Sequence, residues 1–168
     1  MKKYELTSET KVINGVELHR IKALESFGSV EKGELGGWIE SEKNLSQRGD
    51  AWVYDDAMVF NNAKVYDNAE VCGDATISGN ANVRGDAWVG GDAYVRENAD
   101  FIVFKNWWSS GRYFTWTRSN NKWTVGCFYG SGEELIAKAY EDSEKSGREY
   151  ERVVNYVESI LKEEEENN

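Results

Sequence analysis

Chemically versatile side chains are scarce in this sequence. It contains a single histidine, His19, and two cysteines, Cys72 and Cys127. The cysteines lie in different segments, so they predict neither a disulfide framework nor a metal-binding knuckle. No run of about 18 apolar residues occurs, and the start MKKYELTSET lacks the apolar stretch of a signal peptide. We therefore expect a reduced, cytoplasmic protein without metal, cofactor or membrane attachment.

Positive charge is also scarce, because 20 Lys and Arg residues stand against 30 Asp and Glu residues, for a net charge of −10. The excess of acid lies in residues 49–104 and 131–168, whereas the aromatic segment 105–130 between them is basic. An acidic surface disfavours general binding to DNA or to anionic membranes. It fits a soluble protein, or one whose partner is a basic protein.

What the sequence has in abundance is a six-residue repeat, V-x-[GDN]-[DN]-A-x, between Gly49 and Phe104. Its apolar residues alternate with polar ones at a period of two, which indicates strands and not a helix. The Asp, Asn and Gly pairs tolerate the bent backbone of a corner. Three hexads close one triangular coil of 18 residues. The repeat therefore predicts a mainly β protein built on a short parallel β-helix of about three to four coils.

The hexads resemble the hexapeptide-repeat pattern [LIV]-[GAED]-x-x-[STAV]-x, and depart from it at the second position, where Tyr54, Phe60, Tyr66 and Cys72 stand. The stretches LHRIKAL, KGELGGWIES and NLSQRGDAWVYDDA resemble a group of bacterial and phage β-helix proteins that are often labelled putative transferases. This resemblance implies a left-handed coil. Residues 105–162 resemble a recurrent phage module of unknown activity.

The chain divides into three parts: an N-terminal β-hairpin cap (1–35), the β-helix (36–104), and a C-terminal module of a hairpin and two helices (105–168). Asn14-Gly15 predicts the type I′ turn of the first hairpin. Counting back by sixes from Ala51 gives Leu45 and Ile39, so we expect residues 36–48 to form a degenerate opening coil.

In the C-terminal module, residues 112–128 read as a hairpin around Asn120-Asn121, with Arg118 opposite Trp123 and the large aromatics on one face. That face is expected to pack on the helices or to cover the open end of the β-helix, in preference to stacking on nucleic acid. Capping-box spacing places the helix starts at Ser131 and Ser146.

Catalysis is not expected. The acyltransferases that resemble this body use a histidine as general base between subunits, often with a loop extruded from a coil. Here His19 lies in the N-terminal hairpin, and no loop interrupts the hexads. The acidic corners do not follow the nine-residue spacing of calcium-binding β-rolls, so forming corners is the better account of them.

Two sets of residues are candidates for binding. The first is the acidic corners, which would contact a basic protein: Asp55, Asp56, Asp67, Asp74, Asp86 and Asp92. The second is the outward apolar side chains, most of them in the first coil: Trp52, Tyr54, Met58, Phe60, Tyr66, Trp88, Trp107 and Trp108. An apolar patch of this kind needs a cover, either the N-terminal hairpin or another subunit.

These observations, with the phage resemblance, favour a non-enzymatic interaction protein. The most specific hypothesis is a phage or prophage protein that binds and inhibits a basic host protein, such as a nucleic-acid-binding defence factor. The first alternative is a structural protein that oligomerises through its β-helix. The second is a hexapeptide-repeat-type acyltransferase.

Overall fold

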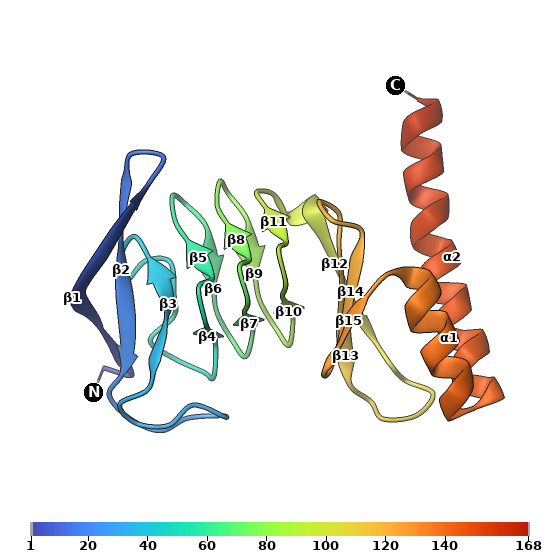
Figure 1. Cartoon of the computed structure of the whole chain (residues 1–168), viewed down its shortest axis with the longest axis horizontal. Coiled ribbons are helices and arrows are strands. Elements are labelled where there is room, and N and C mark those ends of the chain that lie inside the picture. The colour runs from blue at the N-terminus through green and yellow to red at the C-terminus, as the bar shows by residue number, and fades with distance from the viewer. Residues whose placement is uncertain (1, 168) are drawn as a thin grey trace.

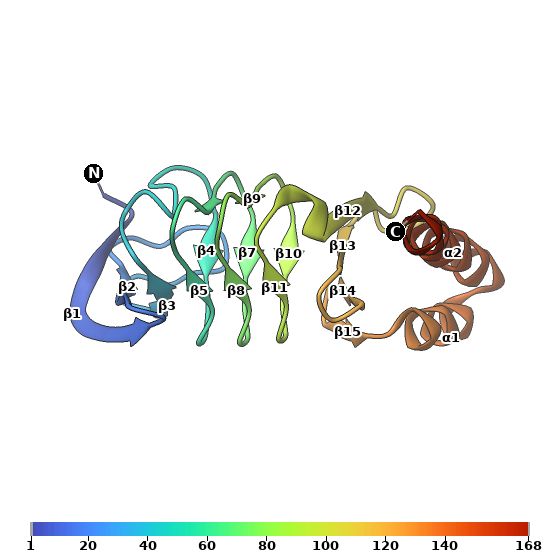
Figure 2. The ribbon, with the colours of Figure 1, turned by 90° about the horizontal axis from the view of Figure 1, so that it is seen from above.

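The computed structural model describes residues 2–167 and shows three parts in a row (Figure 1). A β-hairpin lies at one end, a β-solenoid in the middle, and a small antiparallel sheet with two helices at the other end. Viewed from above, the coils stand side by side like rungs between the two flanking parts (Figure 2). The mainly β class and the order of parts predicted from the repeat are confirmed. Within the described residues, no helix is long and apolar enough to cross a membrane.

The N-terminal hairpin is formed by β1 (Tyr4–Ile13) and β2 (Val16–Ala23), with Ile13 opposite Val16. Asn14 and Gly15 both have positive φ, 52° and 81°, as the type I′ turn requires. Strand β2 pairs antiparallel with β3 (Leu35–Ile39), and β3 pairs in parallel with the first full coil. The hairpin therefore extends one sheet of the solenoid and is part of its structure.

The solenoid consists of two-residue strands, one for each hexad. These strands are β4 (Trp52–Val53), β5 (Met58–Val59), β6 (Lys64–Val65), β7 (Glu70–Val71), β8 (Thr76–Ile77), β9 (Asn82–Val83), β10 (Trp88–Val89) and β11 (Tyr94–Val95). They stack in parallel at a spacing of 18 residues into three faces, which are β4-β7-β10, β5-β8-β11 and β6-β9. The inward alanines and β-branched residues of these hexads are at most 1% exposed, and they form the core.

Each corner depends on a left-handed backbone at the first residue of its pair. Asp55, Asn61 and Asp67 adopt φ of 52°, 58° and 61°, and glycine takes the equivalent place in the later hexads. Asp, Asn and Gly are the residues that tolerate this conformation. The degenerate opening coil is also confirmed, because Ile39 pairs with Val59 and Leu45 bridges to Val65.

The apolar first coil is covered by the chain itself. Trp52 is fully buried, and its ring meets Tyr4 and Phe27 edge-on at centroid distances of 6.0 and 5.4 Å. Phe60 is buried in a second cluster with Leu18 of the hairpin. Of the two covers considered from the sequence, the N-terminal segment is the one that these side chains have.

The C-terminal sheet has four antiparallel strands in chain order, β12 (Phe101–Lys105), β13 (Tyr113–Thr117), β14 (Lys122–Val125) and β15 (Phe128–Gly130). The predicted register of its central hairpin was wrong by two residues. Trp116, and not Arg118, lies opposite Trp123, because residues 118–121 form a longer loop that uses the positive φ of Asn121. A shift of two keeps every side chain on its predicted face.

Both faces of this sheet are covered. Its aromatic face packs against the helices, where Phe114, Trp116 and Trp123 are at most 1% exposed. The opposite face presents threonines to the last coil, and the backbone N–H of Trp88 donates to Thr115 Oγ1 at 3.1 Å. The sheet is therefore both the core of the C-terminal module and the lid on the solenoid.

Helix α1 (Gly132–Asp142) begins at the predicted capping box, in which the Ser131 hydroxyl accepts from the Glu134 N–H. Helix α2 (Glu144–Glu166) begins earlier than predicted. Its N-cap is Ser143, whose hydroxyl accepts from the N–H of Ser146, the residue expected to be the cap itself. Either serine fits the sequence, and the extended backbone of Ser143 decides between them.

Candidate functional site

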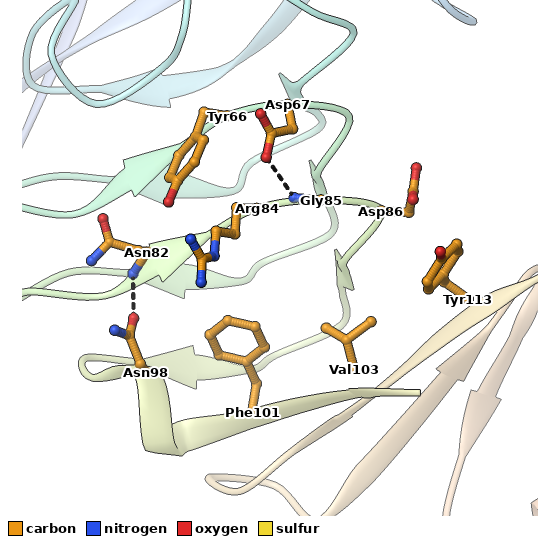
Figure 3. A pocket seen from close by; sticks show the side chains of 10 residues that line it. All are labelled: Tyr66, Asp67, Asn82, Arg84, Gly85, Asp86, Asn98, Phe101, Val103 and Tyr113. Atoms are coloured by element: carbon orange, nitrogen blue, oxygen red, sulfur yellow. Dashed lines mark hydrogen bonds between the residues drawn. The ribbon is translucent and has the colours of Figure 1, made fainter. Parts of the chain in front are cut away.

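The largest hollow of the molecule, about 850 Å³, lies where the third face of the solenoid ends (Figure 3). This face has only two strands, β6 and β9, because the chain turns away through a short 3₁₀ helix (Asn98–Asp100) and continues as β12 toward the C-terminal sheet. We call this hollow the β9 groove. One wall is β9 and the corner after it, and the other is β12.

The two walls of the β9 groove differ in chemistry. Arg84 projects from the β9 side, and Phe101, Val103 and Tyr113 supply the apolar side (Figure 3). Asn98 closes one end, where its Oδ1 accepts the N–H of Asn82 at 2.8 Å. The groove therefore combines an apolar wall, a cation and a polar backbone edge.

A second hollow, about 390 Å³, lies on the face made by β4, β7 and β10. Three carboxylates, those of Asp50, Glu70 and Asp86, line it together with the indole of Trp88. We call it the acidic hollow. Burial raises the pKa of Glu70 above its usual value, since its carboxylate loses water without gaining a cation. Asp86 lines both hollows, so they meet at that corner.

Trp88 is fixed beside the acidic hollow. Its Nε1 donates to the Cys72 Sγ at 3.0 Å, and its side chain is half-buried. An indole face next to carboxylates is a favourable place for a lysine or arginine side chain, because the ring and the acids both attract the cation. Burial raises the pKa of the Cys72 thiol, so this cysteine lacks the thiolate character of a nucleophile.

Most of the predicted acidic residues have structural partners. The carboxylates of Asp55 and Asp67 accept the backbone N–H groups of Gly73 and Gly85, one coil further on, at 3.0 and 3.2 Å. Such bonds tie one coil to the next at the corners. They support the corner-forming account of these residues.

Asp56 and Asp92 are also engaged. Asp56 accepts from the Trp38 Nε1 at 3.3 Å, and Asp92 accepts from the hydroxyl of Tyr129 at 2.7 Å and from Asn120 at 2.9 Å. Asp92 thereby fixes the C-terminal module to the last coil. Asp74 and Asp86 are exposed, and Asp86 receives a hydrogen bond from the side chain of Asn68 at 3.1 Å.

Three of the predicted interface aromatics were wrong, because they are buried inside the chain. Trp52 and Phe60 lie under the N-terminal segment, and Trp108 packs against Tyr150 at a centroid distance of 4.9 Å. The side chains of Tyr54, Met58, Tyr66 and Trp88 are half-buried. Trp107 is 71% exposed and is the most accessible of the set.

The sequence analysis passed over several residues of the two hollows. Glu70 was noted only as the middle of a column with Trp52 and Trp88, and the structure confirms that column. Its neighbours at the adjacent corner, Asp50 and Asp86, are 36 residues apart, two coils of the repeat. Reading the two columns side by side would have found the acidic hollow. The apolar wall of the β9 groove had no such signal, since it depends on where β12 leaves the coil.

The described residues do not bring together a recognisable catalytic set. His19 lies on β2 with its Nε2 3.7 Å from a carboxylate oxygen of Glu17, and it lines neither hollow. Between residues 2 and 167, no group of three or more His, Cys, Asp or Glu side chains is placed to hold a metal ion.

No protein-family model matches this sequence. A 63-residue stretch is 36% identical to the "Uncharacterized acetyltransferase YdcK" of Escherichia coli strain K12. The match covers 33% of this chain and 19% of that protein, so the chain spans less than a fifth of the length of the relative it matches. The similarity and the 18-residue coil together fit a hexapeptide-repeat protein.

Proposed function

We propose that this protein is a non-enzymatic binding module that recognises a basic protein through the acidic hollow. The observation that carries the proposal is the grouping of Asp50, Glu70 and Asp86 around the half-buried indole of Trp88. A lysine or arginine of the partner would lie against the ring and neutralise the carboxylates. Desolvated cation–π contacts are worth up to about 2 kcal/mol, so this position would be the anchor of the interface.

The charge of the surrounding surface supports the same kind of partner. The acidic hollow lies on the face between two corners, one carrying Asp55, Asp56, Asp74 and Asp92 and the other carrying Asp50, Asp67 and Asp86. The remaining corner carries mainly Asn61, Asn62, Asn80 and Asn98. Negative charge is thus concentrated beside the hollow. Such a field speeds the approach of a basic partner and repels nucleic acid.

In its most specific form, the partner is a host nucleic-acid-binding protein, and the gene belongs to a phage or prophage. The acidic corners would then occupy the basic surface that otherwise holds nucleic acid. Binding would inhibit the host protein by competition.

Acyl transfer is the competing proposal, and the name of the E. coli relative is what favours it. The position of His19 on β2, away from both hollows, speaks against it. A thermal-shift titration with acetyl-CoA separates the two. Stabilisation by acetyl-CoA that is lost in His19→Ala would favour the transferase, and an unchanged melting temperature favours the binding module.

The binding proposal is tested by quantitative pull-down from a bacterial lysate with three baits: the wild type, Glu70→Gln/Asp86→Asn, and the control Glu133→Gln/Glu165→Gln. Both variants remove two negative charges, and the control acids are exposed on the C-terminal helices. A basic protein retained by the wild type and the control but lost from the first variant supports the acidic hollow. Equal retention by all three baits contradicts it.

A further inference from the structure

The outer edges of the last coil are treated differently on the three faces of the solenoid. On the first face the N–H of Trp88 is bound by Thr115 Oγ1 at 3.1 Å, and on the second the N–H of Tyr94 is bound by the Ser119 hydroxyl at 2.8 Å. Side chains of the C-terminal sheet thus replace the missing fourth coil. On the third face only the first donor, Asn82, is bound in this way, by Asn98.

The backbone beyond Asn82 is left open. One coil earlier, the equivalent groups of Tyr66 and Asn68 donate to the carbonyls of Val83 and Gly85, 17 residues ahead. The same rule would pair the N–H groups of Arg84 and Asp86 with the carbonyls of Phe101 and Val103. Strand β12 pairs instead with β13, and the side chains of these two residues line the groove. Within residues 2–167, no strand occupies the outer edge of β9.

From this geometry we infer that the β9 groove accepts an extended segment of a partner protein as the missing strand of the third face. Arg84 and Asp86 present their N–H groups two residues apart, about 6.6 Å along a strand. An extended peptide offers carbonyl groups at the same spacing, which is the basis of recognition by strand addition. Exposed edges of this kind are the positions at which other chains pair.

The rest of the groove fits such an occupant. Alternate side chains of an added strand point to opposite sides. One set would lie against Phe101, Val103 and Tyr113, and the other would face solvent or Arg84 (Figure 3). The volume of about 850 Å³ falls within the usual range of about 300–1,000 Å³ for ligand sites.

The shared residue Asp86 gives the occupant a charge preference. A strand that leaves the β9 groove past Asp86 reaches the acidic hollow, where Glu70 and Trp88 would receive a basic side chain. The segment is therefore extended, apolar within the groove and basic beyond it. This inference rests on the proposed function, because it names the form of the same partner.

The test separates the backbone of Arg84 from its side chain. Arg84→Pro removes the N–H, which has no partner within the chain, and proline is tolerated on an edge strand. Arg84→Ala removes the guanidinium and keeps the N–H. A displayed library of random linear nonapeptides is selected on the wild type, and the affinity of each enriched peptide is measured by fluorescence polarisation for all three proteins.

We expect enriched peptides that lose about tenfold or more in affinity for Arg84→Pro and much less for Arg84→Ala. Bound peptide should also slow amide hydrogen exchange at Arg84 and Asp86 of the wild type, a measurement that does not depend on the folding of the proline variant. Peptides that bind both variants equally, without protecting these amides, would overturn the inference, as would a library that yields no binder. Glu70→Gln/Asp86→Asn keeps the backbone edge, so it can lose the basic partner while the strand site survives.

Discussion

The backbone N–H of Trp88 and the hydroxyl of Thr115 form a hydrogen bond of 3.1 Å across the junction between the solenoid and the C-terminal sheet. In an unbroken solenoid this N–H would donate to the backbone of a further coil. Thr115 is fully buried, so no water is available to take its place. A side-chain oxygen therefore ends the repeat at this point and prevents end-to-end stacking of solenoids.

We expect Thr115→Val to lower the free energy of unfolding by about 1–3 kcal/mol, because it keeps the shape of the side chain and leaves a buried N–H without a partner. Thr115→Ser, which keeps the hydroxyl, should cost less. Urea denaturation of both variants measures the difference. Equal stability of the valine and serine variants would mean that the hydrogen bond does not close the solenoid.

Asp55 is expected to matter for stability more than Asp74, although both are exposed corner acids. Asp55 Oδ2 accepts the N–H of Gly73, and its backbone is left-handed at φ 52°. Asp55→Ala loses the bond and strains the backbone, so we expect a loss of roughly 1–2 kcal/mol. Asp55→Gly loses the bond alone and should cost less. Thermal unfolding should place Asp74→Ala within about 0.5 kcal/mol of the wild type; the reverse order of Asp55 and Asp74 would refute this assignment.

Trp52 should behave as a core residue and not as an interface residue. It is fully buried, so we expect Trp52→Ala to cost about 3–5 kcal/mol of stability. Trp52→Phe should cost much less, since the indole Nε1 has no hydrogen-bond partner among the described residues. Light scattering of the phenylalanine variant should give the same oligomeric state as the wild type. A change in that state would restore the interface hypothesis.

Glu70 gives the protein a specific pH dependence. Because its pKa is raised above the ordinary value of 4.5 in the folded state, the folded protein holds this proton more tightly than the unfolded chain does. Its contribution to stability is therefore greatest below that value and falls as the pH rises through the raised pKa. Glu70→Gln should melt up to about 2 °C higher than the wild type at pH 7, with no difference near pH 4. A difference that is the same at both pH values would contradict the burial of this carboxylate.

The solenoid could be predicted from the sequence because its physics is local. An inward Val or Ile, a corner pair and an inward Ala recur every six residues, and each hexad repeats the same geometry. The hairpin turn at Asn14-Gly15 was predictable for the same reason, since two positive φ values are required there.

The junctions could not be predicted, because they depend on contacts between distant segments. The register around Trp116 and Trp123 follows from the way the sheet fits between the last coil and the helices. The start of α2 was decided between two serines by the turn that leads out of α1. The β9 groove exists only because β12 pairs with β13 and not with β9. No six-residue pattern encodes that choice.

The acidic hollow was partly predictable. The sequence analysis named Asp86 and Trp88, and the coil spacing places both beside Glu70. The covers of the first coil were beyond it, since either the hairpin or another subunit could have buried Trp52 and Phe60. The structure shows the N-terminal segment over both side chains.

The measurement that tests the central claim most directly is site-specific photo-cross-linking in the host cell. A photoreactive phenylalanine analogue replaces Trp88 in the acidic hollow, and the control places it at Asn62, on the corner dominated by asparagine. We predict that position 88 cross-links to one protein through a peptide rich in lysine or arginine, and that position 62 does not. Cross-links from position 62 alone, or from position 88 only to acidic or neutral surfaces, would contradict the account.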